Sequence, residues 1–365
     1  MVGCAIERDC TAVDAFNKHR TMREVHVMRY LELIGKVTVL LCFFMMTSLA
    51  VRAEETKTIR FAKQFGIGYL PLTLMEALKL VEKHAGANGL GDVKVEWNQL
   101  SSGAPINDAL IAGQIDFAAG GVGPMLTIWA KTKGGLNVKG VAALNAMPLY
   151  LNTINPNVGS LKDFTDQDRI AMPSVKVSIQ AVTLQMAAAK LFGDDKYDAL
   201  DKLTVSMAHP DGMTSMLSGK SEITAHFTSA PFMYQELNDR RVKRVLSSYD
   251  VLGGPSTFNV MWCAQQFVES NPKAFAAVIA ALEEAMAFIK TNPEQAADIW
   301  GKAEASKMDP ALIKKIITDP ENDWSVAPKN VMAYADFMHK VGSIKTKPAD
   351  WKELFFVNLH QQPGS

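Results

Sequence analysis

The chain has 365 residues, enough for two lobes that each bury a core, and 48% of them are hydrophobic, as in ordinary soluble folded proteins. Lys and Arg (38) balance Asp and Glu (38), so the formal net charge at pH 7 is zero. The overall charge therefore gives no basic footprint that would suggest a nucleic-acid partner.

The N-terminus carries an export signal. A positively charged flank precedes an apolar run over 37–50, and small residues follow it. This order is typical of a secretory signal peptide, and the run is too short to span a membrane comfortably. We predict a signal peptide over 1–53, cleaved after Ala53, and a periplasmic protein. Starting at Met28 would give a leader of the usual length, in which case residues 1–27 are a mis-assigned start.

One cysteine, Cys263, lies outside this leader. The exported protein therefore has no internal disulfide and depends on its core for stability. Cys263 itself is interpreted as a small buried hydrophobic residue.

Residues 54–148 alternate strands with helices. Thr58–Ala62 has the period of a strand, and one amphipathic helix is expected over about 71–85. The further elements expected here are a strand over 93–97, a helix around 108–112, a strand over 115–119 and a helix over 125–131. Such alternation implies βαβ units and a largely parallel sheet.

The same plan repeats over 149–255. The expected elements are a strand over 169–172, a helix over 178–192, a strand over 203–207, a helix over 212–217 and a strand over 223–227. Residues 103–120 and 209–227 correspond, since each has a short helix, a polar turn beginning with glycine and a short strand. We therefore predict an α/β fold of two lobes, over 54–148 and 149–255.

Residues 256–365 are expected to return to the first lobe. An apolar strand over 258–264 makes the crossing, and the remainder is helical. The longest helix opens at Pro272, a residue that is favourable at the first helical position. We expect this C-terminal extension to cap the first lobe.

No motif of a nucleotide- or metal-dependent enzyme occurs in the sequence. Six residues separate Gly212 from Gly219 where a phosphate-binding P-loop needs four, and Gly121-Val122-Gly123 lacks the third glycine of the dinucleotide motif. His209 and His226 form at most a two-member metal set. We predict no cofactor, no metal and no catalytic residue.

Polar or glycine-rich segments recur where strands end and helices begin. They are residues 64–68, 101–103, 120–123, 174–178 and 209–212. Helix N-termini present free N–H groups and a partial positive charge, so several of them around one crevice bind an anion without arginine. Taken singly, each serine is more readily a helix N-cap. Their recurrence in both lobes predicts an anion-binding cleft at the carboxyl ends of the strands.

The sequence resembles periplasmic solute-binding proteins of ABC importers, in the nitrate/sulfonate/taurine (NMT1/THI5-like) family. The resemblance covers about 58–350. It rests on FAKQFGIGYLP, SSGAPINDALIAGQIDFAAGGVGP, SLKDFTDQDRIAMPSVKVSIQAVTLQMAA and the NPKAF…NPEQAADIW tail. It implies the two-lobed type II periplasmic-binding-protein fold, in which two crossing segments form a hinge and the ligand is clamped between the lobes.

The resemblance also implies a set of ligand-binding residues. The first lobe would contribute Gln64, Phe65, Tyr69, Ser101, Ser102, Gly121 and Val122. The second would contribute Ser174, Lys176, Val177 and Ser178, with His209 and His226 as further candidates. Hydroxyls and main-chain N–H groups would hold an anionic head, and Phe65, Tyr69 and Phe227 would suit an organic tail. Lys176 fits a cleft charge and a solvated lysine equally. The strand end AAGGVGP lacks the hydroxyl that many relatives carry there.

The implied function is capture of a small anionic organic solute, such as a sulfonate, taurine or nitrate, and its delivery to a membrane permease with its ATPase. We expect a monomer. Within the same class, a pyrimidine-like or aromatic-acid ligand is the alternative. The alternatives of another class are an enzyme that uses His209, His226 or Cys263 in the same cleft, and a sensor that reports the bound solute to a membrane receptor.

Overall fold

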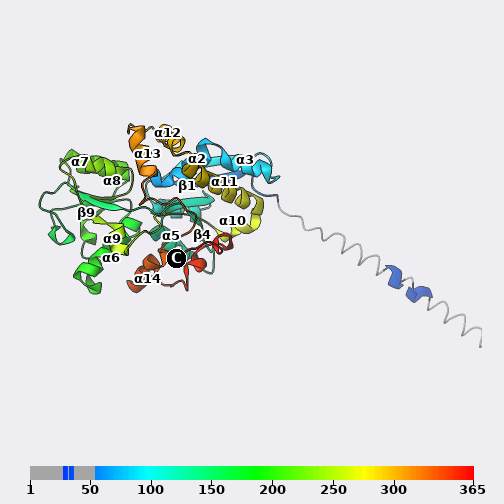
Figure 1. The fold of residues 1–365 in the computed structure, drawn as a ribbon. Coiled ribbons are helices and arrows are strands. Elements are labelled where there is room, and N and C mark those ends of the chain that lie inside the picture. Colours follow the sequence, from blue (N-terminus) through cyan, green and yellow to red (C-terminus); the bar gives the residue numbers. More distant parts are fainter. Residues whose placement is uncertain (1–27, 32, 37–53) are drawn as a thin grey trace, which may run out of the picture. The chain divides into compact units, whose positions relative to one another are not determined.

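The computed structural model describes residues 28–31, 33–36 and 54–365 (Figure 1). The chain divides into two compact units, Met1–Glu54 and Glu55–Ser365. Residues 28–31 and 33–36 are helical and exposed. The other residues of the predicted signal peptide, up to the cleavage site after Ala53, lie outside the described residues. Within the described ranges, no helix is both long and apolar enough to cross a membrane.

Two five-stranded sheets organise Glu55–Ser365. The first has the order β2-β1-β3-β10-β4, and the second has the order β7-β6-β8-β5-β9. The strands of the first sheet are β1 (Thr58–Lys63), β2 (Lys94–Gln99), β3 (Phe117–Gly121), β4 (Lys139–Ala143) and β10 (Asn259–Cys263). Those of the second are β5 (Tyr150–Thr153), β6 (Ile170–Met172), β7 (Thr204–Ser206), β8 (Ala225–Thr228) and β9 (Lys243–Ser247). We call each sheet with its helices a lobe.

The two sheets have the same topology. β1 runs parallel to β2 and β3, and β6 runs parallel to β7 and β8. In each sheet the fourth strand, β10 or β5, is antiparallel to both of its neighbours and belongs to the crossing between the lobes. The predicted α/β class is confirmed, and the antiparallel strand in each sheet is a feature that the sequence pattern does not predict.

Helices cover the sheets and form most of the C-terminal part. Those of the first lobe before the crossing are α2 (Leu70–Ala77), α3 (Leu80–Ala87), α4 (Gly103–Ile111) and α5 (Val122–Thr132). Those of the second lobe are α6 (Ile179–Phe192), α7 (His209–Ser218), α8 (Phe232–Leu237) and α9 (Ser248–Leu252). After β10 come α10 (Gln265–Ser270), α11 (Pro272–Thr291), α12 (Pro293–Ala303), α13 (Pro310–Ile317), α14 (Val331–Lys340) and α15 (Trp351–Leu354).

Residues 71–85 form two helices rather than the single one predicted. Lys79, between α2 and α3, has a left-handed φ of 51° that ends the first helix and redirects the second. Both α2 and α3 pack against α11, with which they are grouped in Figure 1. Leu78, at the break between α2 and α3, is 38% exposed. Two short helices thus both stay in contact with α11, whereas one straight helix of the same length would lose part of that contact.

The C-terminal part contacts both lobes. Ala146, in the first crossing, forms bridges with Thr257 in the second crossing and with Asp323 in the loop after α13. α14 then packs against α5 of the first lobe and α6 of the second. The Tyr334 hydroxyl lies 3.2 Å from Thr183 Oγ1 on α6, and burial raises the pKa of Tyr334 to about 12. A third segment therefore runs beside the two crossings that the resemblance implies.

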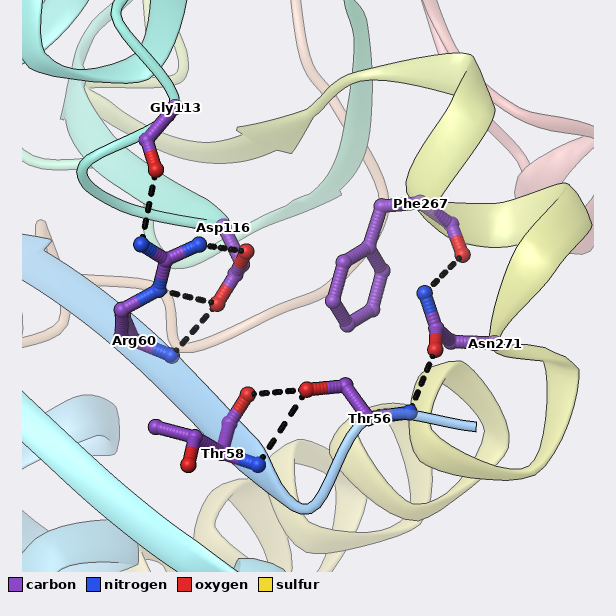
Figure 2. Close-up of polar contacts among 7 residues, drawn as sticks. All are labelled: Thr56, Thr58, Arg60, Gly113, Asp116, Phe267 and Asn271. Carbon is purple, nitrogen blue, oxygen red and sulfur yellow. Dashed lines mark hydrogen bonds and ion pairs between the residues drawn. The ribbon is translucent and has the colours of Figure 1, made fainter. Parts of the chain in front are cut away.

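The N-terminal end of β1 is held by polar contacts at the edge of the sheet opposite the strand carboxyl ends (Figure 2). Asp116 accepts hydrogen bonds from the main-chain N–H of Arg60 at 2.8 Å and from its guanidinium at 3.0 and 2.8 Å. Thr56 N donates to Asn271 Oδ1 at 2.8 Å. These contacts tie the start of the first lobe to the α10–α11 junction.

The core of the first lobe includes Cys263, which is fully buried on β10, as predicted for a small hydrophobic residue. Burial raises the pKa of its thiol well above the usual value, so the thiol is uncharged. Nearby, Phe117 stacks on Phe61 with ring centroids 5.0 Å apart.

Candidate functional site

A cavity lies where the carboxyl ends of strands from both lobes meet helix N-termini. Six of the predicted site residues line it: Gln64, Phe65, Tyr69, Gly121, Ser178 and His209. Five lining residues were not predicted: Gly103, Pro124, Ile179, Gln180 and Phe258. The cavity volume is about 10 Å³, roughly the space that one water molecule needs. The lobes are therefore closed on one another.

Glycines make this closure possible. A Cβ on Gly121 would lie 2.6 Å from Ile179 Cγ2, and a Cβ on Gly123 would lie 2.7 Å from the main-chain oxygen of Val177. Such distances are shorter than any ordinary carbon contact, so the N-terminus of α5 approaches that of α6 as closely as glycine allows. The glycine-rich backbone at 120–123 thus allows close contact between the lobes as well as access of a ligand to the cavity.

Gln64 is the polar side chain of the first lobe that faces the cavity. It follows β1 directly, is 8% exposed, and makes no hydrogen bond to the described residues. The Gln64 amide is therefore a side-chain group of this lobe that is free to hydrogen-bond a ligand in the cavity.

The predicted serines at the helix starts differ in their hydrogen bonds and in their exposure. Ser178 is the N-cap of α6, as expected: its Oγ accepts from Ala181 N at 3.2 Å and donates to the Ser174 carbonyl at 2.7 Å. Ser102 is the buried N-cap residue of α4, yet its hydroxyl makes no capping bond. Ser101 is exposed. Ser178 alone among these serines lines the cavity.

Besides Ser101, Ser102 and His226, four further predicted residues do not line the cavity. Val122 and Ser174 are buried beside the helix starts, and Val177 contributes its carbonyl to the close contact with Gly123. Lys176 is exposed, has a left-handed φ of 65° and does not line the cavity. In this closed arrangement, its placement matches the solvated interpretation rather than a cleft charge.

Three aromatic rings line the cavity: those of Phe65, Tyr69 and Phe258. The Tyr69 hydroxyl accepts a hydrogen bond from Asn259 Nδ2 at 2.9 Å, and burial raises its pKa. The prediction that Phe227 suits an organic tail is wrong for this arrangement, because Phe227 is fully buried in the core and does not line the cavity. It lies on β8, whose alternation turns this side chain away.

His209 and His226 do come together. His209 Nδ1 lies 3.0 Å from His226 Nε2, and His226 Nδ1 lies 2.6 Å from Glu236 Oε1. Burial, and next His226, lower the pKa of His209 well below its usual value, so His209 is neutral. His209 faces the cavity with Gln180, whereas His226 and Glu236 lie behind it. Glu236 was not predicted as part of the site, because no sequence motif surrounds it.

The electrostatics of the cavity come from dipoles. No lining residue is Lys, Arg, Asp or Glu. The helix starts of α4, α5, α6 and α7 each contribute at least one lining residue or N-cap: Gly103, Gly121, Ser178 and His209. Each start carries roughly half a positive charge on its free N–H groups. Their sum favours a negatively charged or acceptor-rich group in the cavity.

Comparisons with known proteins identify the family and the fold. A model of the NMT1-like family matches residues 61–301, more than half of the chain. No curated protein sequence matches. Among solved structures, the alkanesulfonate-binding protein SsuA of Xanthomonas axonopodis pv. citri, bound to MOPS, is 14% identical with a TM-score of 0.63, over 83% of this chain and 97% of that one.

Two further solved structures have the same fold. The periplasmic aliphatic sulphonate-binding protein SsuA of Escherichia coli is 17% identical, with a TM-score of 0.60 over 83% of this chain and 92% of that one. The periplasmic nitrate-binding protein NrtA of Synechocystis PCC 6803 is 16% identical, with a TM-score of 0.64 over 82% and 84%. From the family match and this shared fold, we conclude that the chain belongs to the NMT1-like family and has the two-sheet fold of the periplasmic binding proteins of ABC importers.

Proposed function

We propose that this protein is the solute-binding component of an ABC importer, exported to the periplasm, that captures a small anionic organic solute between its lobes and delivers it to a membrane permease with its ATPase. A sulfonate-, taurine- or nitrate-like compound is the proposed ligand. The names of the similar structures support this ligand class, since two of them bind sulfonates and one binds nitrate.

The observation that carries the proposal is the meeting of four helix N-termini around a cavity without a carboxylate among its lining residues. Main-chain N–H groups with the partial charge of a helix start hold an anion without a lysine or arginine. The Gln64 amide, which has no partner among the described residues, adds a side-chain donor on the first lobe.

The closed cavity holds about one water, so the ligand must enter while the lobes are further apart. In that more open arrangement we propose that Ser101, Ser102, Val122, Ser174, Lys176 and Val177, which border the helix starts, complete the site.

A thermal-shift measurement tests the proposal. Ethanesulfonate, taurine and nitrate are added separately to the purified protein, with sodium chloride as the control for ionic strength. A ligand at 100 times its Kd stabilises the folded state by about 2.7 kcal/mol, which for a domain of this size raises Tm by roughly 4 °C. A Tm that moves no more with any of these anions than with chloride would count against this ligand class.

A pyrimidine-like or aromatic-acid ligand is the second candidate. The observation that favours it is the three aromatic rings, Phe65, Tyr69 and Phe258, among the lining residues. Cytosine and benzoate in the same thermal-shift panel separate the two candidates, because only a ligand with an aromatic ring gains from stacking against these rings.

A further inference from the structure

A chain of buried polar groups leads from the cavity into the second lobe. Gln180 Nε2 lies 3.2 Å from His209 Nε2, and His209 Nδ1 lies 3.0 Å from His226 Nε2. His226 Nδ1 lies 2.6 Å from Glu236 Oε1. These four side chains are at most 5% exposed. They come from α6, α7, β8 and α8, and we call them the relay.

Glu236 is the only carboxyl group of the relay and lies at the end away from the cavity. Its second oxygen accepts from Asn152 Nδ2 at 2.9 Å, and its one ion-pair partner among the described residues is His226. An unpaired charge buried in this way costs several kcal/mol. The Glu236–His226 pair is therefore neutral as a whole. Compared with an ionised Glu236 beside a neutral His226, it holds one extra proton, either on the histidine or on the carboxyl group.

That proton count fixes the direction of the next hydrogen bond. If the extra proton is on His226, both its ring nitrogens are donors; if it is on Glu236, His226 accepts through Nδ1 and donates through Nε2. His209 Nδ1 is the acceptor in both cases, so neutral His209 carries its proton on Nε2. Thr228 Oγ1 lies 3.4 Å from both His209 Nδ1 and the Ser229 carbonyl, so its one proton donates to either of them and this hydroxyl does not fix the direction.

Gln180 completes the relay at the cavity. A half-turn of its amide exchanges oxygen and nitrogen at the same positions, so the hydrogen bonds decide its orientation. The structure places Gln180 Nε2 toward His209, so when His209 Nε2 carries the proton the amide takes the turned orientation: the Gln180 oxygen accepts from His209 Nε2 and the NH₂ group is left for the cavity. In a relay with a net negative charge, His226 Nδ1 donates to the Glu236 carboxylate, the His226–His209 and His209–Gln180 hydrogen bonds run the other way, and the oxygen of Gln180 faces the cavity.

We infer that the neutral Glu236–His226 pair sets the hydrogen bonds of His209 and Gln180, so that the relay ends in a donor and selects a ligand that accepts. Glu236 and His226 are positioning residues, and Gln180 touches the ligand. This inference rests on the proposed binding role of the cavity and narrows the ligand to one with an acceptor-rich head. It also gives the second lobe a side-chain donor opposite Gln64.

Nitrogen-15 NMR of the imidazole rings in the purified, ligand-free protein tests the relay directly, with His209→Gln and His226→Gln used only to assign the signals. We expect His209 to be neutral, with a proton on Nε2 and none on Nδ1. A His209 ring with its proton on Nδ1 overturns the inference whether or not any anion binds. If instead Nε2 is protonated but no anion binds, the proposed function fails while the direction of the relay stands.

Ethanesulfonate titrations of two variants test the consequence for binding. Glu236→Leu removes the group that sets the direction, and we expect its Kd to rise at least about tenfold, or about 1.4 kcal/mol. Glu236→Gln should rescue binding to within about threefold, because Asn152 Nδ2 holds the amide oxygen and the NH₂ group then donates to His226 Nδ1.

Asp168→Asn is the matched control, since Asp168 is a buried carboxylate of the same lobe outside the cavity. An unchanged Kd in a folded Glu236→Leu variant, or a Kd that rises as much in Asp168→Asn, would overturn the inference. If Glu236→Leu does not fold, the NMR result on the wild-type protein decides.

Discussion

Replacing Gly123 with alanine should weaken ligand binding by roughly 10- to 100-fold, because it prevents the lobes from closing. The new Cβ would lie 2.7 Å from the Val177 carbonyl and 3.3 Å from Ile179 N, both main-chain atoms that cannot move aside alone. Overpacking of this kind costs about 1–3 kcal/mol, and here the cost falls on the closed state only. Alanine in a helix is otherwise favoured over glycine by up to about 1 kcal/mol. Titration with ethanesulfonate gives the affinity.

Gly86→Ala is the matched control. Gly86 lies in α3, and a Cβ there meets no atom within 4 Å. It should leave the affinity unchanged while adding the same helix preference. Solution scattering at saturating ethanesulfonate should give a larger radius of gyration for Gly123→Ala than for the wild type. Equal affinities and equal radii would show that closure does not depend on this contact.

Asn259→Ala should lower the stability of the ligand-free protein by about 2–3 kcal/mol, which corresponds to a fall in Tm of roughly 3–5 °C. Asn259 is fully buried at the start of β10 and donates to the Tyr69 hydroxyl at 2.9 Å. Its Oδ1 lies 3.4 Å from Asn145 Nδ2, which in turn donates to the Gly68 carbonyl at 2.5 Å. Removing it leaves buried polar groups without partners beside the cavity.

Thermal denaturation measures this effect, and Asn157→Ala serves as the control because Asn157 is an exposed loop residue. The control should change stability by less than about 0.5 kcal/mol. Asn259→Ala should also weaken ligand binding, since the Tyr69 ring that it holds lines the cavity. Equal Tm values for the two variants would mean that the network around Asn259 does not stabilise the crossing between the lobes.

Local patterns predict most elements of the fold. The alternation of short apolar runs with amphipathic segments leads to strands within a few residues of β1, β2, β3, β6, β7 and β8. It fails at Lys79, where the sequence continues a helical pattern and the chain turns instead. The turn exists because two short helices fit α11, a helix about 200 residues away in the sequence. Contacts at that separation leave no local periodicity.

The candidate site also has features that local sequence patterns predict and features that depend on distant contacts. Helix starts such as Ser178 are visible in the sequence because a capping hydroxyl acts on its own helix. Gln180 and Glu236 carry no local signal, since each acquires its role from a partner on another element. Likewise, Gly123 gains its importance only from Val177 on the opposite lobe. Charge balance in the relay is a property of the assembled fold, so sequence patterns do not reveal it.

We propose that the cavity between the lobes binds a small acceptor-rich organic anion. Native mass spectrometry is the decisive measurement of this binding. The protein is purified without denaturation and then mixed with an equimolar panel of small sulfonates, carboxylates and nitrate. We predict one added mass per protein molecule, matching one anion, and a much smaller bound fraction for Gly123→Ala than for Gly86→Ala. A spectrum that shows only the unliganded mass, or equal binding by both variants, would mean that the closed cavity does not bind such an anion.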